Sequence, residues 1–180
     1  MTSRLAVLFD LDGTLVDSEP HAHEVAYAYT RELGLVLSGG GQPAGSSGED
    51  YFARMSAASG IDAEELYAGY WERLRAVFVE QLVAVPATYR LAVGLRAAGV
   101  PIAVVSNSRH QRVLETLEIA APLLQGCPIV GADDVARPKP APDPYLRGAE
   151  LLRVRPEDCV VVEDTELGAA AARAAGMEVM

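Results

Sequence analysis

The sequence predicts an α/β fold in which a parallel sheet carries helices on both faces and a separate all-helical domain is inserted into the chain. Three observations support this prediction. Short apolar runs without polar alternation recur between helical patterns after residue 86, as expected of strands buried on both faces of a parallel sheet. The block 17–86 has helical periodicity and no convincing strand. Polar residues directly follow three of the apolar runs.

The composition is that of a soluble globular protein. The chain has 180 residues, of which 50% are hydrophobic and 22% charged, and a formal net charge of −10. The acidic excess disfavours nucleic acid and anionic membranes as partners, because both attract basic surfaces. Cys127 and Cys159 are too few for a disulfide framework and lie among apolar residues. Without an apolar run of ~20 residues or a secretory signal, the cytoplasm is the expected location.

The first expected element is a strand at 5–9, which stops abruptly at Asp10. Helical periodicity then begins at Ser18, an N-cap candidate, and ends at Gly34. The remainder of the inserted block is expected to hold a glycine-rich loop or hinge at 38–48, a short helix ending at Gly60, and a longer helix that begins with the capping pair Asp62 and Glu65.

From residue 87 onwards, strands and helices are expected to alternate. The expected strands cover 102–105, 128–130, 159–162 and 178–179. Such alternation implies right-handed crossovers and a parallel sheet. The expected core domain is therefore 1–16 together with 87–180, and 17–86 is the inserted helical domain. Because the chain stops inside the last expected strand, this edge of the sheet is expected to be incomplete.

Polar side chains follow three of the expected strands, at the point where each strand ends. In strand order they are Asp10 and Asp12, Ser106 and Asn107, and Glu163 and Asp164. Ligands of open parallel sheets bind at the carboxyl ends of strands, so we expect these six residues to gather there. Four clustered carboxylates require a proton or a cation among them. Oxygen ligands without His or Cys favour a hard cation such as Mg²⁺.

Four segments in order along the chain resemble the motifs of the haloacid dehalogenase superfamily of phosphohydrolases. They are Phe-Asp-Leu-Asp-Gly-Thr-Leu at 9–15, Val-Val-Ser-Asn at 104–107, Arg-Pro-Lys-Pro-Ala-Pro-Asp at 137–143, and Val-Glu-Asp-Thr at 162–165. The inserted block resembles the cap domain of the phosphoglycolate phosphatase and β-phosphoglucomutase branch. The resemblance covers nearly the whole chain and implies a Rossmann-like core with a cap that closes over the active site.

The resemblance further implies a Mg²⁺-dependent phosphatase that forms an aspartyl-phosphate. Asp10 would be the nucleophile and Asp12 the general acid and base. The residues that bind the substrate phosphate would be Ser106, Asn107 and Lys139, and Lys139 would also be catalytic because it neutralises charge shared by nucleophile and phosphate. The metal ligands would be Asp10, the main-chain carbonyl of Asp12, Glu163 directly or through water, and Asp164.

Simpler interpretations remain open for several of these residues. The Asp10 and Asp12 pair, taken alone, is more often a turn or a helix cap. Ser106 suits an N-cap, and Lys139 suits an exposed loop, although the prolines on both sides of it favour a fixed geometry.

Two departures from the resembling branch disfavour a sugar phosphomutase. Mutases of this branch carry a His where this chain has Ala22, and His21 and His23 point to other faces of the helix. They also carry an Arg in the cap where this chain has Gly48. A phosphatase acting on a small phosphomonoester, either a sugar phosphate or phosphoglycolate, is therefore favoured. The alternatives are a phosphomutase and a catalytically silent phosphometabolite-binding protein, and the expected assembly is a monomer or weak homodimer. Asp12 argues against dehalogenation.

Overall fold

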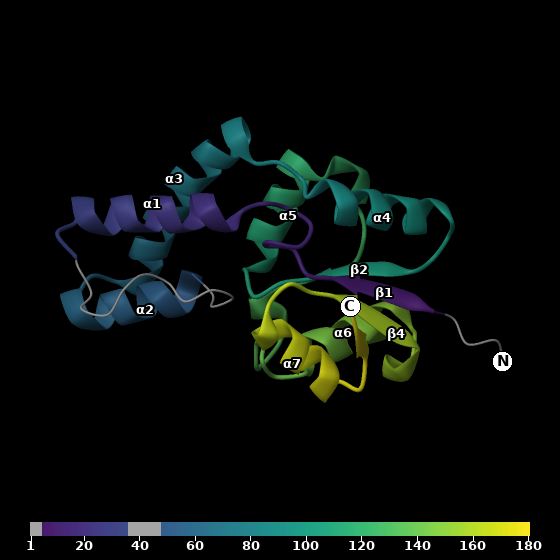
Figure 1. The fold of residues 1–180 in the computed structure, drawn as a ribbon. Helices are drawn as coiled ribbons and strands as arrows, with labels where there is room; N and C mark the ends of the chain where they lie inside the picture. Colours follow the sequence, from purple (N-terminus) through teal and green to yellow (C-terminus); the bar gives the residue numbers. More distant parts are fainter. Residues whose placement is uncertain (1–4, 36–47) are drawn as a thin grey trace. The chain divides into compact units, whose positions relative to one another are not determined.

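Five parallel strands form one sheet in the order β3-β2-β1-β4-β5 (Figure 1). Their bounds are β1 Ala6–Phe9, β2 Ile102–Val105, β3 Ile129–Val130, β4 Cys159–Val162 and β5 Glu178–Val179. The central strand β1 pairs with both β2 and β4, and Phe9 lies opposite Val104 and Val162. This register brings the residues that follow β1, β2 and β4 to the same edge of the sheet.

Helices cover both faces of the sheet, which confirms the predicted fold class. The helices α4 (Pro86–Ala97) and α5 (His110–Ala120) lie on one face, and α6 (Asp143–Leu152) and α7 (Glu166–Ala174) lie on the other (Figure 1). Short 3₁₀ turns occupy Pro122–Leu124, Ala132–Asp134 and Pro156–Asp158. Between the sheet and α6, the fully buried side chains of Leu8, Val105 and Tyr145 belong to one apolar cluster. Gly148 permits this packing, because a Cβ there would overlap Leu8.

In its described residues, 18–35 and 48–82, the inserted segment forms three helices around an aromatic core. They are α1 Glu19–Glu32, α2 Gly48–Ser59 and α3 Ala63–Gln81. Phe52 and Tyr70 are buried, with ring centroids 4.9 Å apart. Asp62 begins α3 as expected, since its carboxylate accepts the main-chain N–H groups of Glu64 and Glu65. Ser18 precedes α1, but its side chain makes no capping hydrogen bond, because its backbone is helical rather than extended.

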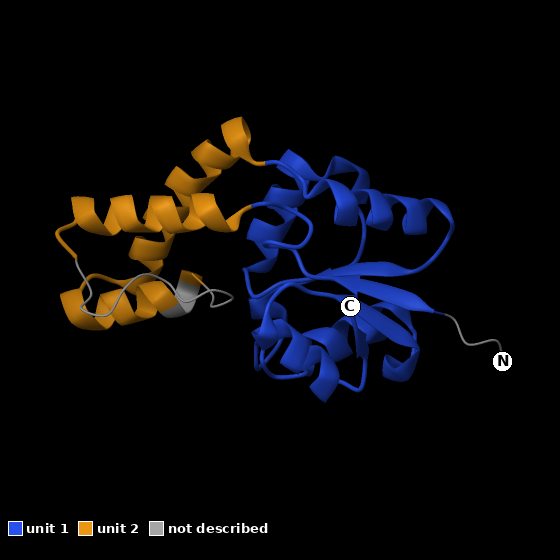
Figure 2. Ribbon diagram, viewed as in Figure 1, with its two compact units in different colours: residues 1–17, 83–180 blue, residues 18–82 orange. Residues whose placement is uncertain are grey.

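The structure is a computed structural model that describes residues 5–35 and 48–180. The chain divides into two compact units, 1–17 with 83–180 and 18–82 (Figure 2). The core unit thus begins again four residues before the expected position 87. The reason is hydrogen bonding to the segment after β1: Asp17 N donates to Val83 O, and Val85 N donates to Leu15 O. Of the expected loop at 38–48, only Gly48 lies within the described residues. None of the helices described is both long and apolar enough to cross a bilayer.

Candidate active site

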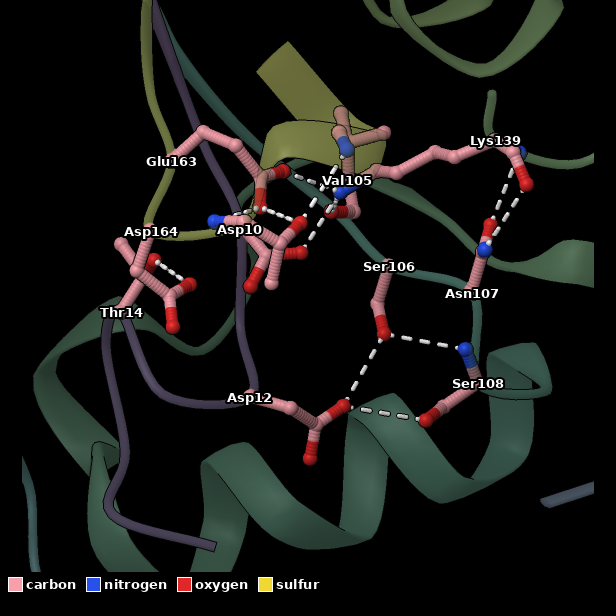
Figure 3. Close-up of polar contacts among 12 residues, drawn as sticks. Asp10, Asp12, Thr14, Val105, Ser106, Asn107, Ser108, Lys139, Glu163 and Asp164 are labelled. Atoms are coloured by element: carbon pink, nitrogen blue, oxygen red, sulfur yellow. Dashed lines mark hydrogen bonds and ion pairs between the residues drawn. The ribbon is translucent and has the colours of Figure 1, made fainter. Parts of the chain in front are cut away.

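The carboxyl edge of the sheet gathers all seven residues that the sequence nominated (Figure 3). They come from the segments after β1, after β2, before α6 and after β4, and they are Asp10, Asp12, Ser106, Asn107, Lys139, Glu163 and Asp164. Asp10 directly follows β1 and its main-chain N–H donates to Val162 O at 2.9 Å. The sheet register therefore sets the position of Asp10 beside the start of the segment that carries Glu163.

Lys139 lies at the centre of the buried part of this site. Its Nζ donates to Asp10 Oδ1 at 2.6 Å, to Glu163 Oε2 at 2.8 Å and to Val105 O at 3.0 Å. An ammonium has three N–H donors, so each donor is matched to one acceptor. The side chain is only 3% exposed. The position of this positive charge is therefore fixed by its partners.

Burial and the ion pairs with Lys139 shift the pKa values in opposite directions for the three buried groups, which are Lys139, Glu163 and Asp10. Burial alone would lower the pKa of Lys139, but Asp10 and Glu163 raise it above its ordinary value. Burial would raise the pKa of Glu163, but Lys139 and two neighbouring hydroxyls lower it. Burial raises the pKa of Asp10 well above its usual range, and Lys139 offsets only part of this effect. One ammonium between two carboxylates leaves an uncompensated negative charge in a buried site, which a further cation would offset.

The Glu163 carboxylate is held from several directions. Oε2 accepts the Tyr145 hydroxyl at 2.6 Å in addition to Lys139. Oε1 accepts both the main-chain N–H of Thr165 at 3.1 Å and its hydroxyl at 2.7 Å. Gly168 leaves room for this carboxylate, because a Cβ there would overlap it. These contacts fix both Glu163 and, through it, the Lys139 ammonium.

The Asp164 carboxylate lies beside the turn that follows β1. Its Oδ1 accepts the Thr14 hydroxyl at 2.7 Å. Gly13 has a φ of 86°, and a Cβ at this position would overlap Asp164 Oδ2. Glycine is therefore required here both for its conformation and for its small size.

Three carboxylates of the site have the geometry of a cation site. One oxygen each of Asp10, Glu163 and Asp164 lies within 4.8 Å of the others. All three donors are oxygen atoms, which suit a hard divalent cation. Because the buried carboxylates exceed the ammonium in charge, the residues present fit such an ion.

The Asp12 carboxylate points to a different set of donors. Oδ2 accepts the Ser106 hydroxyl at 3.2 Å and the Ser108 hydroxyl at 3.0 Å. Oδ1 accepts Arg112 Nη2 at 3.2 Å. Two carboxylates separated by one residue thus have distinct surroundings, since Asp10 contacts a lysine and Asp12 contacts hydroxyls and an arginine.

Asn107 holds the main chain of Lys139. Its Oδ1 accepts Lys139 N at 2.9 Å, and its Nδ2 donates to Lys139 O at 3.1 Å. This pair of bonds ties the segment after β2 to the segment that carries the ammonium. One N–H of the Asn107 amide is left for other acceptors.

Sequence reasoning missed Ser108, Arg112 and Tyr145. The neighbouring Ser106 was a signal for Ser108, because both hydroxyls follow the same strand. No comparable signal existed for the other two, since an arginine within a helix is usually exposed and a tyrosine near a helix start usually belongs to the core. The two histidines that flank Ala22 lie in the inserted unit, where His21 packs edge-on against Phe78 and His23 is exposed.

Comparison with known proteins identifies the family to which this chain belongs. A model of the haloacid dehalogenase-like hydrolase family matches residues 5–176. Hexitol phosphatase A of Escherichia coli (strain K12) is 38% identical over 96% of this chain and 80% of its own length. Phosphoglycolate phosphatase of Xanthomonas campestris pv. campestris (strain 8004) is 33% identical over the same shares, 96% and 80%. The chain therefore belongs to the haloacid dehalogenase-like hydrolase family, which confirms the resemblance seen in its four motifs.

The same fold occurs in a solved structure. CbbY from Rhodobacter sphaeroides, in complex with phosphate, matches this structure with a TM-score of 0.84 over 97% of this chain and 84% of that chain. The two sequences are 24% identical. At this identity, the match supports a shared fold and nothing further.

Proposed function

We propose that this protein is a Mg²⁺-dependent phosphatase that hydrolyses a small phosphomonoester, a sugar phosphate or a phosphoglycolate-like acid, through an aspartyl-phosphate on Asp10. The observation that carries the proposal is the 2.6 Å contact between the buried Asp10 carboxylate and the Lys139 ammonium, beside two further carboxylates. The names of the two enzymes that are 38% and 33% identical support a phosphate ester as substrate.

In the first step, a carboxylate oxygen of Asp10 attacks phosphorus and the bond between phosphorus and the ester oxygen breaks. Asp12 gives its carboxyl proton to the leaving oxygen, so the alcohol departs neutral. Lys139 stabilises the negative charge that Asp10 and the phosphoryl group share. The remaining amide N–H of Asn107 is a proposed donor to phosphoryl oxygens. The Ser106 hydroxyl, whose one O–H donates to Asp12 in this structure, would turn to a phosphoryl oxygen when substrate binds.

In the second step, Asp12 is a carboxylate and takes a proton from a water molecule as its oxygen attacks phosphorus. The bond from phosphorus to Asp10 breaks, which releases inorganic phosphate and restores the Asp10 carboxylate. The proton that Asp12 gains replaces the one that it gave up. Both half-reactions therefore balance without another reactant.

The proposed metal ligands are Asp10, Asp164, the main-chain carbonyl of Asp12, and Glu163 directly or through water. A bound divalent cation would supply positive charge that reduces the repulsion between the Asp10 carboxylate and the phosphate. Because Lys139, Tyr145 and Thr165 already hydrogen-bond Glu163, a water-mediated contact is the arrangement that disturbs the site least.

The test is a panel of phosphomonoesters assayed for phosphate release with Mg²⁺ and with EDTA. Release is expected with Mg²⁺ and is expected to stop with EDTA. Asp10→Asn should lower kcat by more than about 10³-fold, because the nucleophile is lost. Asp158→Asn is the matched control, since Asp158 precedes β4 and pairs with Arg155. Full activity of Asp10→Asn would contradict the proposal.

The same assay separates the alternatives. A phosphomutase would yield an isomeric sugar phosphate instead of free phosphate, and a silent binding protein would bind a phosphate ester without turnover. Ala22 on α1 is buried and stands where mutases of the resembling branch carry a histidine. The lack of this histidine favours the phosphatase over the mutase. A cytoplasmic location and a monomeric or weakly dimeric state stay predictions.

A further inference from the structure

Arg112 is a buried cation that the mechanism above does not use. It is the third residue of α5, and its side chain is 7% exposed. Among its contacts, Nη2 lies 3.2 Å from Asp12 Oδ1, although the two residues are 100 positions apart in the chain. Arginine side chains are seldom buried unless they are paired, so the contact with Asp12 accounts for an unusual placement.

The scaffold that carries Arg112 is fixed. The first turn of α5 is tied to another segment, because the main-chain N–H of His110 donates to Asp133 Oδ1 at 2.7 Å. His110 Nδ1 also lies 2.6 Å from Asp134 Oδ2. The guanidinium is therefore presented to Asp12 from a helix whose start is anchored.

The contacts around Asp12 restrain both oxygens of its carboxylate. Arg112 contacts Oδ1, whereas the hydroxyls of Ser106 and Ser108 contact Oδ2. The main chain of Asp12 forms a bridge with Val16, which restrains the loop as well. The Asp12 side chain is nevertheless 22% exposed, so it can reach a substrate atom.

We propose that Arg112 is a positioning residue that, together with Ser108, orients the Asp12 carboxyl group for proton transfer to the leaving oxygen. The inference rests on the proposed phosphatase function and adds a residue to it. Misplacement of a reacting group by about 1 Å can cost about 10²-fold in rate. Loss of Arg112 should therefore slow the reaction through its effect on Asp12, whose carboxylate it contacts.

The leaving group distinguishes orientation of a general acid from a merely structural role. An aryl phosphate such as p-nitrophenyl phosphate has an acidic leaving group that departs without a proton, whereas an alkyl phosphate needs one. The quantity to compare is kcat/KM, which reports the steps through breakage of the ester bond when phosphoryl transfer to Asp10 is irreversible. A general structural defect would lower kcat/KM for both substrates equally.

The experiment compares Arg112→Met, Arg112→Lys and Ser108→Ala with the unaltered protein on p-nitrophenyl phosphate and on its best alkyl phosphate. Arg112→Met should lower kcat/KM about 10²-fold for the alkyl ester and less than about 10-fold for the aryl ester. Arg112→Lys should recover part of the loss, and Ser108→Ala should show the same preference more weakly. Arg96→Met is the matched control, because Arg96 donates from α4 to Leu123 O.

Each outcome is decisive. Equal losses on the two esters would overturn the proposal, as would a loss confined to a higher KM, which would make Arg112 a substrate ligand. If Arg112→Met does not fold, Ser108→Ala and Arg112→Lys still give the comparison between the esters. Failure of the unaltered protein on every ester, with Mg²⁺ present, would instead overturn the phosphatase function.

Discussion

Lys139 Nζ lies 2.6 Å from Asp10 Oδ1, and both side chains are buried. The same ammonium also contacts Glu163 Oε2 at 2.8 Å. Replacement of the lysine would leave two carboxylates facing each other without the charge that separates them. The contact therefore contributes to stability as well as to the proposed chemistry.

Lys139→Met is expected to destabilise the protein by about 3 kcal/mol, because removal of one partner leaves a buried charge uncompensated. Turnover should fall about 10³-fold, since the positive charge beside the nucleophile is lost. Urea unfolding and phosphate release measure the two effects. Lys139→Arg should not restore turnover, because a planar guanidinium does not match three acceptors arranged around an ammonium. Turnover by Lys139→Arg within tenfold of that of the unaltered protein would contradict this account.

Tyr145→Phe should lower the free energy of unfolding by about 1.5–3 kcal/mol, the range for a hydrogen bond to a charged acceptor. The lost bond is the 2.6 Å contact from the hydroxyl to Glu163 Oε2. Turnover should also fall, because Glu163 helps to fix Lys139. Tyr89→Phe is the control, since the Tyr89 hydroxyl accepts Leu123 N at 3.3 Å on an exposed surface. Equal effects of the two substitutions would refute a special role for Tyr145.

Gly13→Ala should abolish metal-dependent activity, because the added Cβ would displace the Asp164 carboxylate. Gly99→Ala is the control: its φ of 77° imposes a similar backbone strain, but the added Cβ would meet nothing within 4 Å. Backbone strain should cost each variant about 1 kcal/mol or more of stability, and Gly13→Ala should lose more than Gly99→Ala because of the added overlap. Only Gly13→Ala should weaken Mg²⁺ binding, which isothermal titration calorimetry of each variant measures. Unchanged Mg²⁺ affinity in Gly13→Ala would argue against Asp164 as a ligand.

Asp134 gives a prediction of pH dependence outside the site. Partial burial would raise its pKa, but hydrogen bonds from Gly131 N and from His110 lower it below its ordinary value of 3.8. A lowered pKa in the folded state stabilises the protein above the ordinary pKa, and this contribution is lost as the pH falls through the folded-state value. Asp134→Asn should thus cost about 1 kcal/mol at pH 7 and progressively less below pH 3.8. Urea unfolding of Asp134→Asn and of the unaltered protein at pH 7 and pH 3 tests this prediction. The same difference in the free energy of unfolding at both pH values would contradict it.

The sequence alone determined the class of fold and the edge of the sheet that carries the site. Apolar runs of strand length identified the strands β1, β2, β3 and β4. The acidic and hydroxyl residues that directly follow three of them had to meet at one edge, because parallel strands all end on the same side. Asp10, Ser106 and Glu163 could be found in this way because the information is local: each is the residue next to a strand.

Tertiary structure decided which side chains contact each other. Tyr145, Arg112 and the main-chain role of Asn107 depend on how α5, α6 and the segment around Lys139 pack against the sheet. Their partners lie between 18 and 100 positions away in the chain. Hydrogen bonds of this kind require positions within a fraction of an ångström, which depend on packing of the whole core and leave no periodic trace in the sequence. Local patterns therefore fixed the kinds of groups at the site, and packing fixed their pairing.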